Sequence, residues 1–380
     1  MSTSRNQKAL ELASRWDLEH IPAPASQIDP IKIENCIGFT KVPLGVAGPL
    51  RVKGPNADGS FYAPLATQEA TLVASCSRGC KAFSASGGVQ FDVLSQGMSR
   101  APVFIFANPA SAVKFAREWP SLEEKFGKWA VSTSRYAKLQ KTKAHIIGSQ
   151  VHLFCSFHCA AASGQNMVSK ATKHACDQLR SLYGDKYSIK DWVVEGNLSS
   201  DKKPSWGNVK DARGVEVVAW GSVSDQDCQN ILGCTTKRLN DQVVTLIKGG
   251  IRNGMFGSNV NTTNVLAGMF IATGQDAASV GESAWSDLTP EYDEETKVLT
   301  LSLYFPSILI ATVGGGTGNP TQREALRMVQ CDQPEDKEKL AGLMASFALA
   351  LDISTAAAIA NDTFTASHMR LARGEAKSKL

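Results

Sequence analysis

A small set of ionisable side chains in this chain combines types that can do acid–base and charge-stabilising chemistry. A lysine ammonium can stabilise negative charge that develops on a substrate oxygen, and a carboxyl or imidazole group can transfer the accompanying protons. The adjacent lysines stand in a loop after a Gly-Asn pair, and one aspartate directly follows an apolar run. The candidates are Glu69, Lys202, Asp276 and His368, with Lys203 beside the first lysine.

Each candidate also has an ordinary structural interpretation. Small and apolar residues predict a helix over residues 67–83, so Glu69 can be a buried structural partner inside that helix. Asp276 can cap a helix, adjacent loop lysines are usually solvated, and His368 can lie on the surface after the last long helix. Spacing alone leaves both interpretations open.

Four segments are rich in glycine or small polar residues, and their backbone amides could bind phosphate groups. None matches the G-x-G-x-x-G dinucleotide fingerprint or the G-x-x-x-x-G-K-[ST] phosphate loop, so each one alone is better explained by a turn than by a ligand site. An enzyme with an unusual dinucleotide-binding fold would also produce this pattern. The segments are residues 38–48, 160–166, 249–259 and 313–319.

Composition excludes several classes of protein. The 380 residues are 43% hydrophobic and 20% charged, which is typical of a globular protein with about two domains rather than a disordered or coiled-coil chain. The 40 basic and 36 acidic residues give a net charge of +4 without a concentrated basic face, so we expect no nucleic-acid partner. No apolar run reaches the roughly 20 residues of a membrane span and no leader is recognised, so we expect a cytoplasmic protein.

Nine cysteines without a C-x-x-C pair argue against a disulfide framework. Cys155, His158 and Cys159 have spacing that a zinc site could use, but they lie in an apolar stretch. We therefore expect buried thiols and no metal.

The elements that must position these side chains alternate between strands and helices. Between residues 102 and 192 the pattern is strand, helix, strand, helix, strand, which predicts a small α+β unit. A helix is predicted over residues 7–19. Later elements are a strand over 215–223, helices over 235–247, 261–273, 321–329 and 337–360, and a hairpin-like segment over 299–313.

Seven segments together resemble, in the same order, the 3-hydroxy-3-methylglutaryl-CoA (HMG-CoA) reductase family from about residue 25 to residue 370. The DKK form and the spacing resemble the class I, eukaryotic-type catalytic portion. The segments are ENCIGFTKVPLGVAGPL (34–50), ATQEATLVASCSRGCKA (66–82), GMSRAP (97–102), SDKKP (200–204), TGQDAA (273–278), TVGGGT (312–317) and SHM (367–369).

The resemblance implies a reaction and a catalytic set. The reaction is the NADPH-dependent reduction of HMG-CoA to mevalonate and CoA through a mevaldehyde-level intermediate. The family's catalytic residues fall on Glu69, Lys202, Asp276 and His368. Lys202 would stabilise the carbonyl oxygen, His368 would protonate the CoA thiolate, Glu69 would protonate the aldehyde, and Asp276 would orient Lys202 and couple it to Glu69.

The resemblance also implies binding residues. A guanidinium group at Arg135 beside Ser134 would contact the 2′-phosphate and favour NADPH. The cofactor residues implied are Ser134, Arg135, Tyr136, Gly164, Asn166, Gly314, Gly315 and Gly316. The substrate residues implied are Arg100, Glu195, Asn197, Asp201, Lys203, Lys248 and Asn264.

The implied fold is α+β, with a large mixed helix/sheet CoA-binding domain and an inserted small ferredoxin-like α+β dinucleotide-binding domain. The expected boundaries are an N-terminal helical segment at 1–25, the large domain at 26–101 and 193–370, the inserted domain at 102–192, and a basic tail at 371–380. Members of the family assemble their sites from two subunits, so a homodimer or homotetramer is expected. The membrane tether of eukaryotic relatives is not expected in this chain.

Several residues depart from the family pattern. Ala161 stands where the family has Asp, Ser163 where it has Met, and Glu195 where it has a small hydroxyl residue; Asn261 replaces a usual His, and Gly374 a phosphorylatable Ser. A second carboxylate at Glu195 would repel the substrate unless it is protonated or paired. Two alternatives therefore stay open: a paralogue with a shifted acyl-CoA substrate, and a catalytically weak paralogue that binds ligands or sequesters inhibitor.

Overall fold

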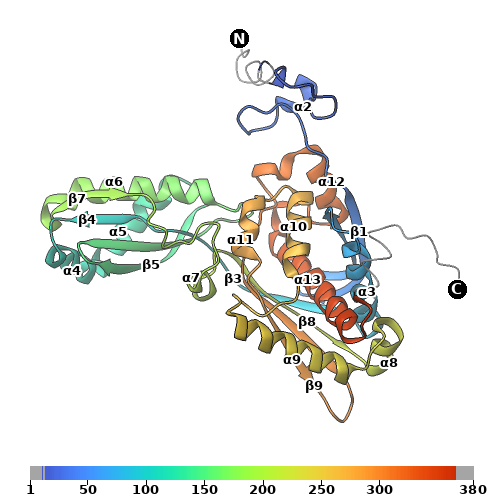
Figure 1. Cartoon of the computed structure of the whole chain (residues 1–380). Coiled ribbons are helices and arrows are strands. Elements are labelled where there is room, and N and C mark those ends of the chain that lie inside the picture. Colours follow the sequence, from blue (N-terminus) through green and yellow to red (C-terminus); the bar gives the residue numbers. More distant parts are fainter. Residues whose placement is uncertain (1–10, 12, 365–380) are drawn as a thin grey trace.

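The computed structural model describes residues 11 and 13–364 and consists of a body with an elongated lobe on one side (Figure 1). The strands are β1 (Leu44–Gly54), β2 (Ala57–Ala66), β3 (Val89–Arg100), β4 (Val103–Phe106), β5 (Lys138–Ile147), β6 (Gln150–His158), β7 (Ile189–Val193), β8 (Gly214–Val223), β9 (Asp287–Tyr292) and β10 (Leu299–Ile308).

The helices alternate with these strands along the chain. They are α2 (Ala25–Ile28), α3 (Leu72–Ala85), α4 (Pro109–Glu118), α5 (Pro120–Val131), α6 (Gln165–Tyr187), α7 (Trp206–Lys210), α8 (Asp225–Asp227), α9 (Thr236–Asn253), α10 (Thr262–Thr273), α11 (Val280–Ser283), α12 (Pro320–Met328) and α13 (Lys337–Ala360). Short 3-10 turns at Ala277–Ser279 and Gly315–Gly318 flank the predicted site. The mixed α+β fold predicted from the sequence is confirmed.

Strand β3 belongs to both halves of the molecule. Its residues Val89 to Gly97 pair with β8 of the body, and Met98 to Arg100 pair with β6 of the lobe. The resulting strand order is β7-β4-β6-β3-β8-β10-β9, with β1 and β2 paired beside β3 and β5 paired with β6. Arg100, at the end of β3, therefore lies where the two halves meet.

Helix α13 forms the centre of the body and packs against α3, α10, β3 and β8. Its faces are apolar all round, as expected of a helix buried on every side. Among the described helices, α13 alone is long and apolar enough to span a membrane, with a mean hydropathy of 1.8 in its most apolar 18-residue stretch. The sequence analysis did not predict this. However, 94% of that stretch is buried inside the protein. We therefore describe α13 as a core helix.

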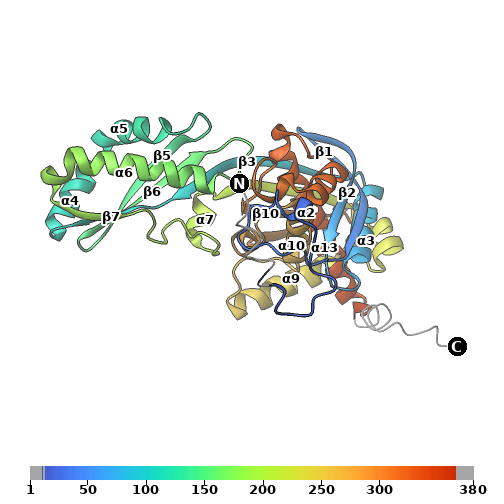
Figure 2. The same ribbon diagram turned by 90° about the horizontal axis from the view of Figure 1, so that it is seen from above.

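The lobe has its own hydrophobic core, in which five phenylalanines gather: Phe104, Phe106, Phe115, Phe126 and Phe157. Its elements follow the order β4, α4 with α5, β5, β6, α6, β7, and its antiparallel strands lie in the order β7-β4-β6-β5. This is the β-α-β-β-α-β arrangement of ferredoxin-like units. Figure 2 shows that the helices cover one face of this sheet.

Three sequence predictions need correction. Glu69 is not in a helix, because Thr71 adopts a left-handed backbone (φ 78°) and α3 begins only at Leu72. The sequence pattern predicted one strand between the two helices of the 102–192 unit, but a turn at Gly148 divides this stretch into the β5–β6 hairpin. The segment over 299–313 contains one strand, β10, which ends at Ile308 and whose hairpin partner is β9.

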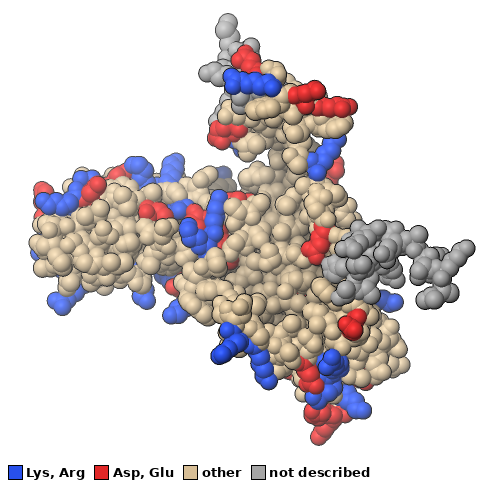
Figure 3. Space-filling view, viewed as in Figure 1, with Lys and Arg blue, Asp and Glu red and all other residues tan. Residues whose placement is uncertain are grey.

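Cysteine burial agrees with the sequence analysis. All nine cysteines are buried free thiols, as predicted. Within residues 11 and 13–364, no group of three or more His, Cys, Asp or Glu side chains could hold a metal ion. On the face seen in Figure 3, Lys and Arg are scattered among Asp and Glu rather than gathered in one patch.

Candidate active site

Two of the four predicted catalytic side chains are paired directly. Lys202 Nζ lies 3.0 Å from Asp276 Oδ2, and each side chain is 45% exposed. The hydrogen bond to Asp276 raises the pKa of Lys202. Asp276 also accepts a hydrogen bond from the backbone N–H of Ala278 at 3.1 Å, so it caps the following 3-10 turn while it holds the lysine. The interpretation of Asp276 as a cap is confirmed, and its catalytic role stays a prediction.

Glu69 has a different partner. Its Oε2 accepts a hydrogen bond from Asn264 Nδ2 at 2.9 Å, and its side chain is exposed rather than buried. Glu69 and Asn264 line a cavity of about 580 Å³ between α3, α9 and α10. Among the described residues, neither Lys202 nor Asp276 lines this cavity, and no hydrogen bond or ion pair joins them to Glu69. His368 lies outside the described residues.

The predicted substrate residues gather at the end of β3. Arg100, only 8% exposed, places Nη1 3.4 Å from Glu195 Oε2 and 3.5 Å from Asp201 Oδ2. Glu195 Oε2 also accepts hydrogen bonds from Ser199 Oγ at 2.6 Å and Ala101 N at 3.2 Å. The carboxylate that the sequence analysis regarded as repulsive is therefore paired.

Three buried polar atoms at this junction have no partner among the described residues: Arg100 Nε, Gln165 Nε2 and Glu195 Oε1. Gln165, the first residue of α6, was not predicted, although its backbone oxygen accepts a hydrogen bond from Arg100 at 3.4 Å. Two donors and one acceptor suit a ligand that carries both an acid group and a hydroxyl group.

The other predicted substrate residues lie in two places. Lys203 Nζ donates to the backbone oxygen of Asp201 at 3.1 Å, and Asn197 adopts a left-handed backbone (φ 64°) in the same loop. Lys248 is exposed on α9, which continues to Asn253, beyond the helix end predicted at residue 247. The structure thus does not bring Lys248 into this cluster through any contact among the described residues.

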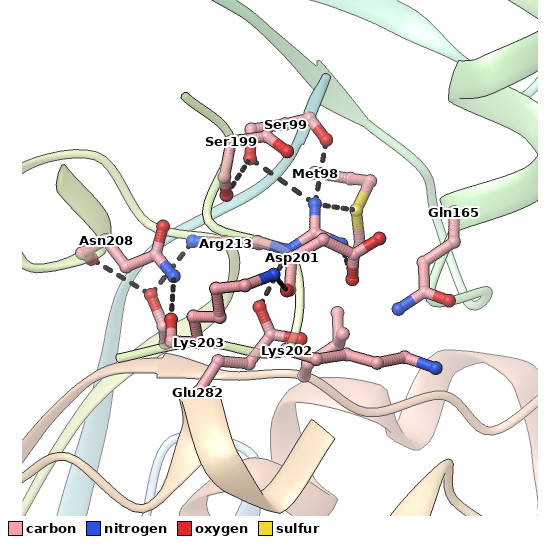
Figure 4. A network of polar contacts seen from close by, with 12 residues as sticks. Met98, Ser99, Gln165, Ser199, Asp201, Lys202, Lys203, Asn208, Arg213 and Glu282 are labelled. Carbon is pink, nitrogen blue, oxygen red and sulfur yellow. Dashed lines mark hydrogen bonds and ion pairs between the residues drawn. The ribbon is translucent and has the colours of Figure 1, made fainter. Parts of the chain in front are cut away.

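A buried ion pair beneath the lysine loop was missed by the sequence analysis (Figure 4). Arg213 Nε lies 2.7 Å from Glu282 Oε2, with both side chains 0% exposed, and Arg213 Nη2 lies 2.7 Å from Asp201 Oδ1. Burial raises the pKa of Glu282 to about 7, although Arg213 favours its charged form. Partial burial opposes ionisation of Asp201, but Arg213 and Arg100 lower its pKa. No short motif in the sequence marks Arg213 or Glu282.

The predicted cofactor residues occupy conformations that suit a dinucleotide. Gly164 (φ 92°) caps the 23-residue helix α6, and a side chain there would overlap Cys159. The amino end of a long helix attracts phosphate groups, and Asn166 is exposed in its first turn. Gly314 and Gly315 have positive φ with open space around them, while Gly316 packs against Gly274 beside the Asp276 turn.

The predicted 2′-phosphate residues are also accessible. Arg135 stacks on the ring of Tyr136, 4.8 Å from its centroid. Ser134 Oγ accepts hydrogen bonds from the backbone N–H groups of Tyr136 and Ala137 at 3.2 and 3.4 Å. A guanidinium group held in this way fits a phosphate ligand.

The loop that carries Ala161 and Ser163 is fixed to the body. Lys337 Nζ donates to the backbone oxygens of Ala160 and Ala162 at 3.1 and 3.0 Å, and Thr312 N donates to that of Ala161 at 3.1 Å. Burial lowers the pKa of Lys337 to about 8. Asn261, another departure from the family pattern, is held by Asp352 and Thr355 of α13.

Comparison with known proteins decides the family. The family described as hydroxymethylglutaryl-coenzyme A reductase matches residues 2–373. The chain belongs to the HMG-CoA reductase family.

Relatives in this family come from archaea and plants. The chain is 38% identical to the 3-hydroxy-3-methylglutaryl-coenzyme A reductase of Aeropyrum pernix, over 91% of this chain and 82% of that protein. It is 35% identical to the Pyrococcus abyssi reductase, over 98% and 93%. It is 32% identical to reductase 1 of Hevea brasiliensis, over 96% and 65%.

Solved structures support the fold. The class II reductase of Streptococcus pneumoniae bound to NADPH in open conformations matches with a TM-score of 0.68 at 17% identity, over 93% of this chain and 83% of that one. At this identity the likeness concerns the fold alone. The chain is therefore an oxidoreductase-family protein with the HMG-CoA reductase fold.

Proposed function

We propose that this protein reduces HMG-CoA to mevalonate and CoA with NADPH, through an aldehyde-level intermediate. The observation that carries the proposal is the Lys202–Asp276 ion pair, in which a half-exposed ammonium group is held in place by a carboxylate. Such a fixed cation can stabilise the oxyanion that forms when a thioester or aldehyde carbonyl is reduced. The family membership names the substrate class.

NADPH, when bound, supplies the hydride, and two molecules are needed because a thioester becomes an alcohol. Arg135 and Ser134 would hold its 2′-phosphate, and the Gly164 end of α6 would hold its pyrophosphate. Tyr136, Asn166 and the glycines at 314–316 complete the proposed cofactor site. We assign residues 102–192 to the dinucleotide-binding domain and residues 26–101 with 193–370 to the substrate domain.

The residues of the chain then have separate roles in catalysis and substrate binding. Lys202 holds the carbonyl oxygen, and Asp276 fixes Lys202. Glu69, positioned by Asn264, donates a proton at the aldehyde oxygen, while His368 protonates the CoA thiolate. Arg100 Nε, Gln165 Nε2 and Glu195 Oε1 are suited to the hydroxy-acid end of the substrate, because they offer two donors and one acceptor.

We further propose that the active unit is an oligomer in which two subunits share a site. In one chain, Glu69 with Asn264 and Lys202 with Asp276 form separate pairs, so a second copy of the chain can supply one pair to the other. We assign the chain to the class I type on two grounds: its DKK motif, and its 32–38% identity to archaeal and plant relatives. Size-exclusion chromatography with light scattering measures the oligomeric state.

The direct test is NADPH oxidation with HMG-CoA as substrate, with the product identified by mass spectrometry. Saturable turnover with two NADPH consumed per mevalonate supports the proposal. The Lys202→Ala variant should bind NADPH normally and lose nearly all turnover. Turnover only with a different acyl-CoA would favour a paralogue of shifted substrate, and tight binding without turnover would favour a binding or inhibitor-sequestering protein.

A further inference from the structure

The buried ion pair of Arg213 and Glu282 lies under the loop that carries Lys202 and has no part in the function derived so far. Arg213 stands just before β8 and Glu282 lies in α11, and both side chains are fully buried. Moving two charges out of water costs more than their attraction usually returns, so a buried pair is weak evidence of a stabilising role. The contacts of Arg213 and Glu282 indicate a role other than stabilising the fold.

Arg213 connects three segments through its guanidinium group. Nη1 donates to the backbone oxygen of Ser99 at 2.7 Å, Nε lies 2.7 Å from Glu282, and Nη2 lies 2.7 Å from Asp201. Asp201 directly precedes Lys202. One rigid, planar guanidinium group therefore fixes the Lys202 loop relative to the end of β3 and to α11.

The loop itself requires external support. Ser200 and Lys202 both adopt left-handed backbone conformations, with φ of 54° and 60°. Such conformations are unfavourable for residues with a side chain and persist where the surroundings hold them. Next to Glu282, Gly281 packs so closely on this loop that a Cβ at that position would lie 3.2 Å from the backbone oxygen of Lys202.

We propose that Arg213 and Glu282 are positioning residues for the Lys202 ammonium group. They hold the left-handed loop through Asp201 (Figure 4), and the loop places Lys202 against Asp276 and the substrate oxygen. The inference rests on the proposed function, in which Lys202 stabilises the oxyanion. Without the pair, the charge would be present but displaced, and a displacement of about 1 Å can cost about 100-fold in rate.

Two variants test this. Glu282→Gln keeps the shape and one acceptor oxygen but removes the charge that binds Arg213. Gly281→Ala changes no charge and pushes directly on the backbone of Lys202. The matched control is Glu216→Gln on β8, a carboxylate held by Ser95 and Tyr304 and not in contact with the Lys202 loop.

Three measurements are made on each folded variant: kcat and KM with HMG-CoA and NADPH, the thermal midpoint, and the pH-dependent acylation rate of Lys202 by mass spectrometry. We expect Glu282→Gln to lower kcat by about 10- to 100-fold and Gly281→Ala, which requires a smaller shift, to lower it by about 3- to 10-fold, with the KM for NADPH within twofold of wild type in both. Lys202 should be acylated faster, because its pairing with Asp276 weakens. Because Gly281→Ala changes no charge, it separates displacement of the Lys202 loop from the loss of the Glu282 charge.

Variants that fold and keep kcat within twofold of wild type would overturn the inference. A lowered kcat with unchanged Lys202 acylation in Gly281→Ala would overturn it too, because the loss would then not pass through Lys202. If the wild-type protein shows no HMG-CoA turnover, the proposed function fails, while the acylation measurement still tests whether the pair positions Lys202.

Discussion

Replacing Asp276 by Asn separates catalysis from stability at the Lys202–Asp276 pair. Asn keeps the size of the side chain and can still accept the N–H of Ala278, so the 3-10 turn should survive. The substitution removes the carboxylate charge that lies 3.0 Å from Lys202 Nζ. Lys202 itself stays charged at neutral pH, because even an unperturbed lysine has a pKa of about 10.4.

The expected magnitudes differ sharply between stability and activity. Both side chains are 45% exposed, and ion pairs at such positions contribute about 0–1 kcal/mol to stability. The free energy of unfolding should therefore fall by less than about 1 kcal/mol. Turnover should fall by about 100-fold or more, which corresponds to about 2.7 kcal/mol of transition-state stabilisation, because Lys202 is no longer held at the substrate oxygen.

The assay compares Asp276→Asn with Asp241→Asn. Asp241 pairs with Lys237 on α9 at 2.8 Å, with both side chains 50% exposed, so it matches the site pair in geometry and exposure. Urea unfolding should give similar small changes for the two variants, and only Asp276→Asn should lose NADPH oxidation. Wild-type turnover in Asp276→Asn, or an unfolding change several times that of the control, would refute the reasoning.

Three further predictions concern neighbouring groups. Glu195→Gln keeps one acceptor, which Ser199 and Ala101 occupy, and replaces the acceptor Oε1 proposed for the substrate hydroxyl group by an amide donor. The KM for HMG-CoA should therefore rise about 5- to 10-fold, and an unchanged or lowered KM would count against this. Lys337→Met leaves two backbone carbonyls of the Ala160 loop without their hydrogen-bond donor, and each unpaired carbonyl costs about 1–3 kcal/mol. The KM for NADPH should therefore rise at least about tenfold with little change in kcat, and an unchanged NADPH affinity in a fluorescence titration would contradict this. Burial raises the pKa of Asp352 to about 7, above its unfolded value, so the stability that its protonated form contributes is complete below about pH 4 and is lost as pH rises through 7. The loss is on the order of 3–4 kcal/mol in the free energy of unfolding. Unfolding free energies measured from pH 4 to 8 should therefore vary less in Asp352→Asn than in the wild type, and parallel profiles would refute the assignment.

Sequence patterns identified the long elements of the fold well. The predicted helix over 337–360 coincides with α13, and the strand predicted to open the 102–192 unit coincides with β4, because a continuous apolar run and a short β-rich run bounded by prolines allow few alternatives. The Glu69 helix was misplaced because the left-handed backbone at Thr71 follows from tertiary packing rather than from residue type. The β5–β6 turn, by contrast, has a local signal, because Gly148 and Ser149 form the two-residue loop of a β-hairpin between Ile147 and Gln150.

The sequence singled out the exposed polar residues of the candidate site but not the buried residues that hold them in place. Lys202 and Asp276 stand in short polar segments between apolar ones, where a sequence pattern can single them out. Arg213 and Glu282 are separated by about 70 positions and meet only through the fold, and a lone Glu in the segment VGES gives no local signal. The pairing that fixes Glu195 likewise depends on Arg100, which is about 95 positions away.

The strand shared by the two halves has a mechanical consequence. Pairing passes from β8 to β6 between Gly97 and Met98, and a side chain at Gly97 would lie 2.7 Å from Ser156 Oγ and 2.8 Å from the backbone oxygen of Ala212. Twisting of the lobe against the body must therefore act on the peptide that leads directly to Arg100. The last residues of β3 thus connect the orientation of the proposed cofactor domain directly to the position of Arg100, a proposed substrate residue.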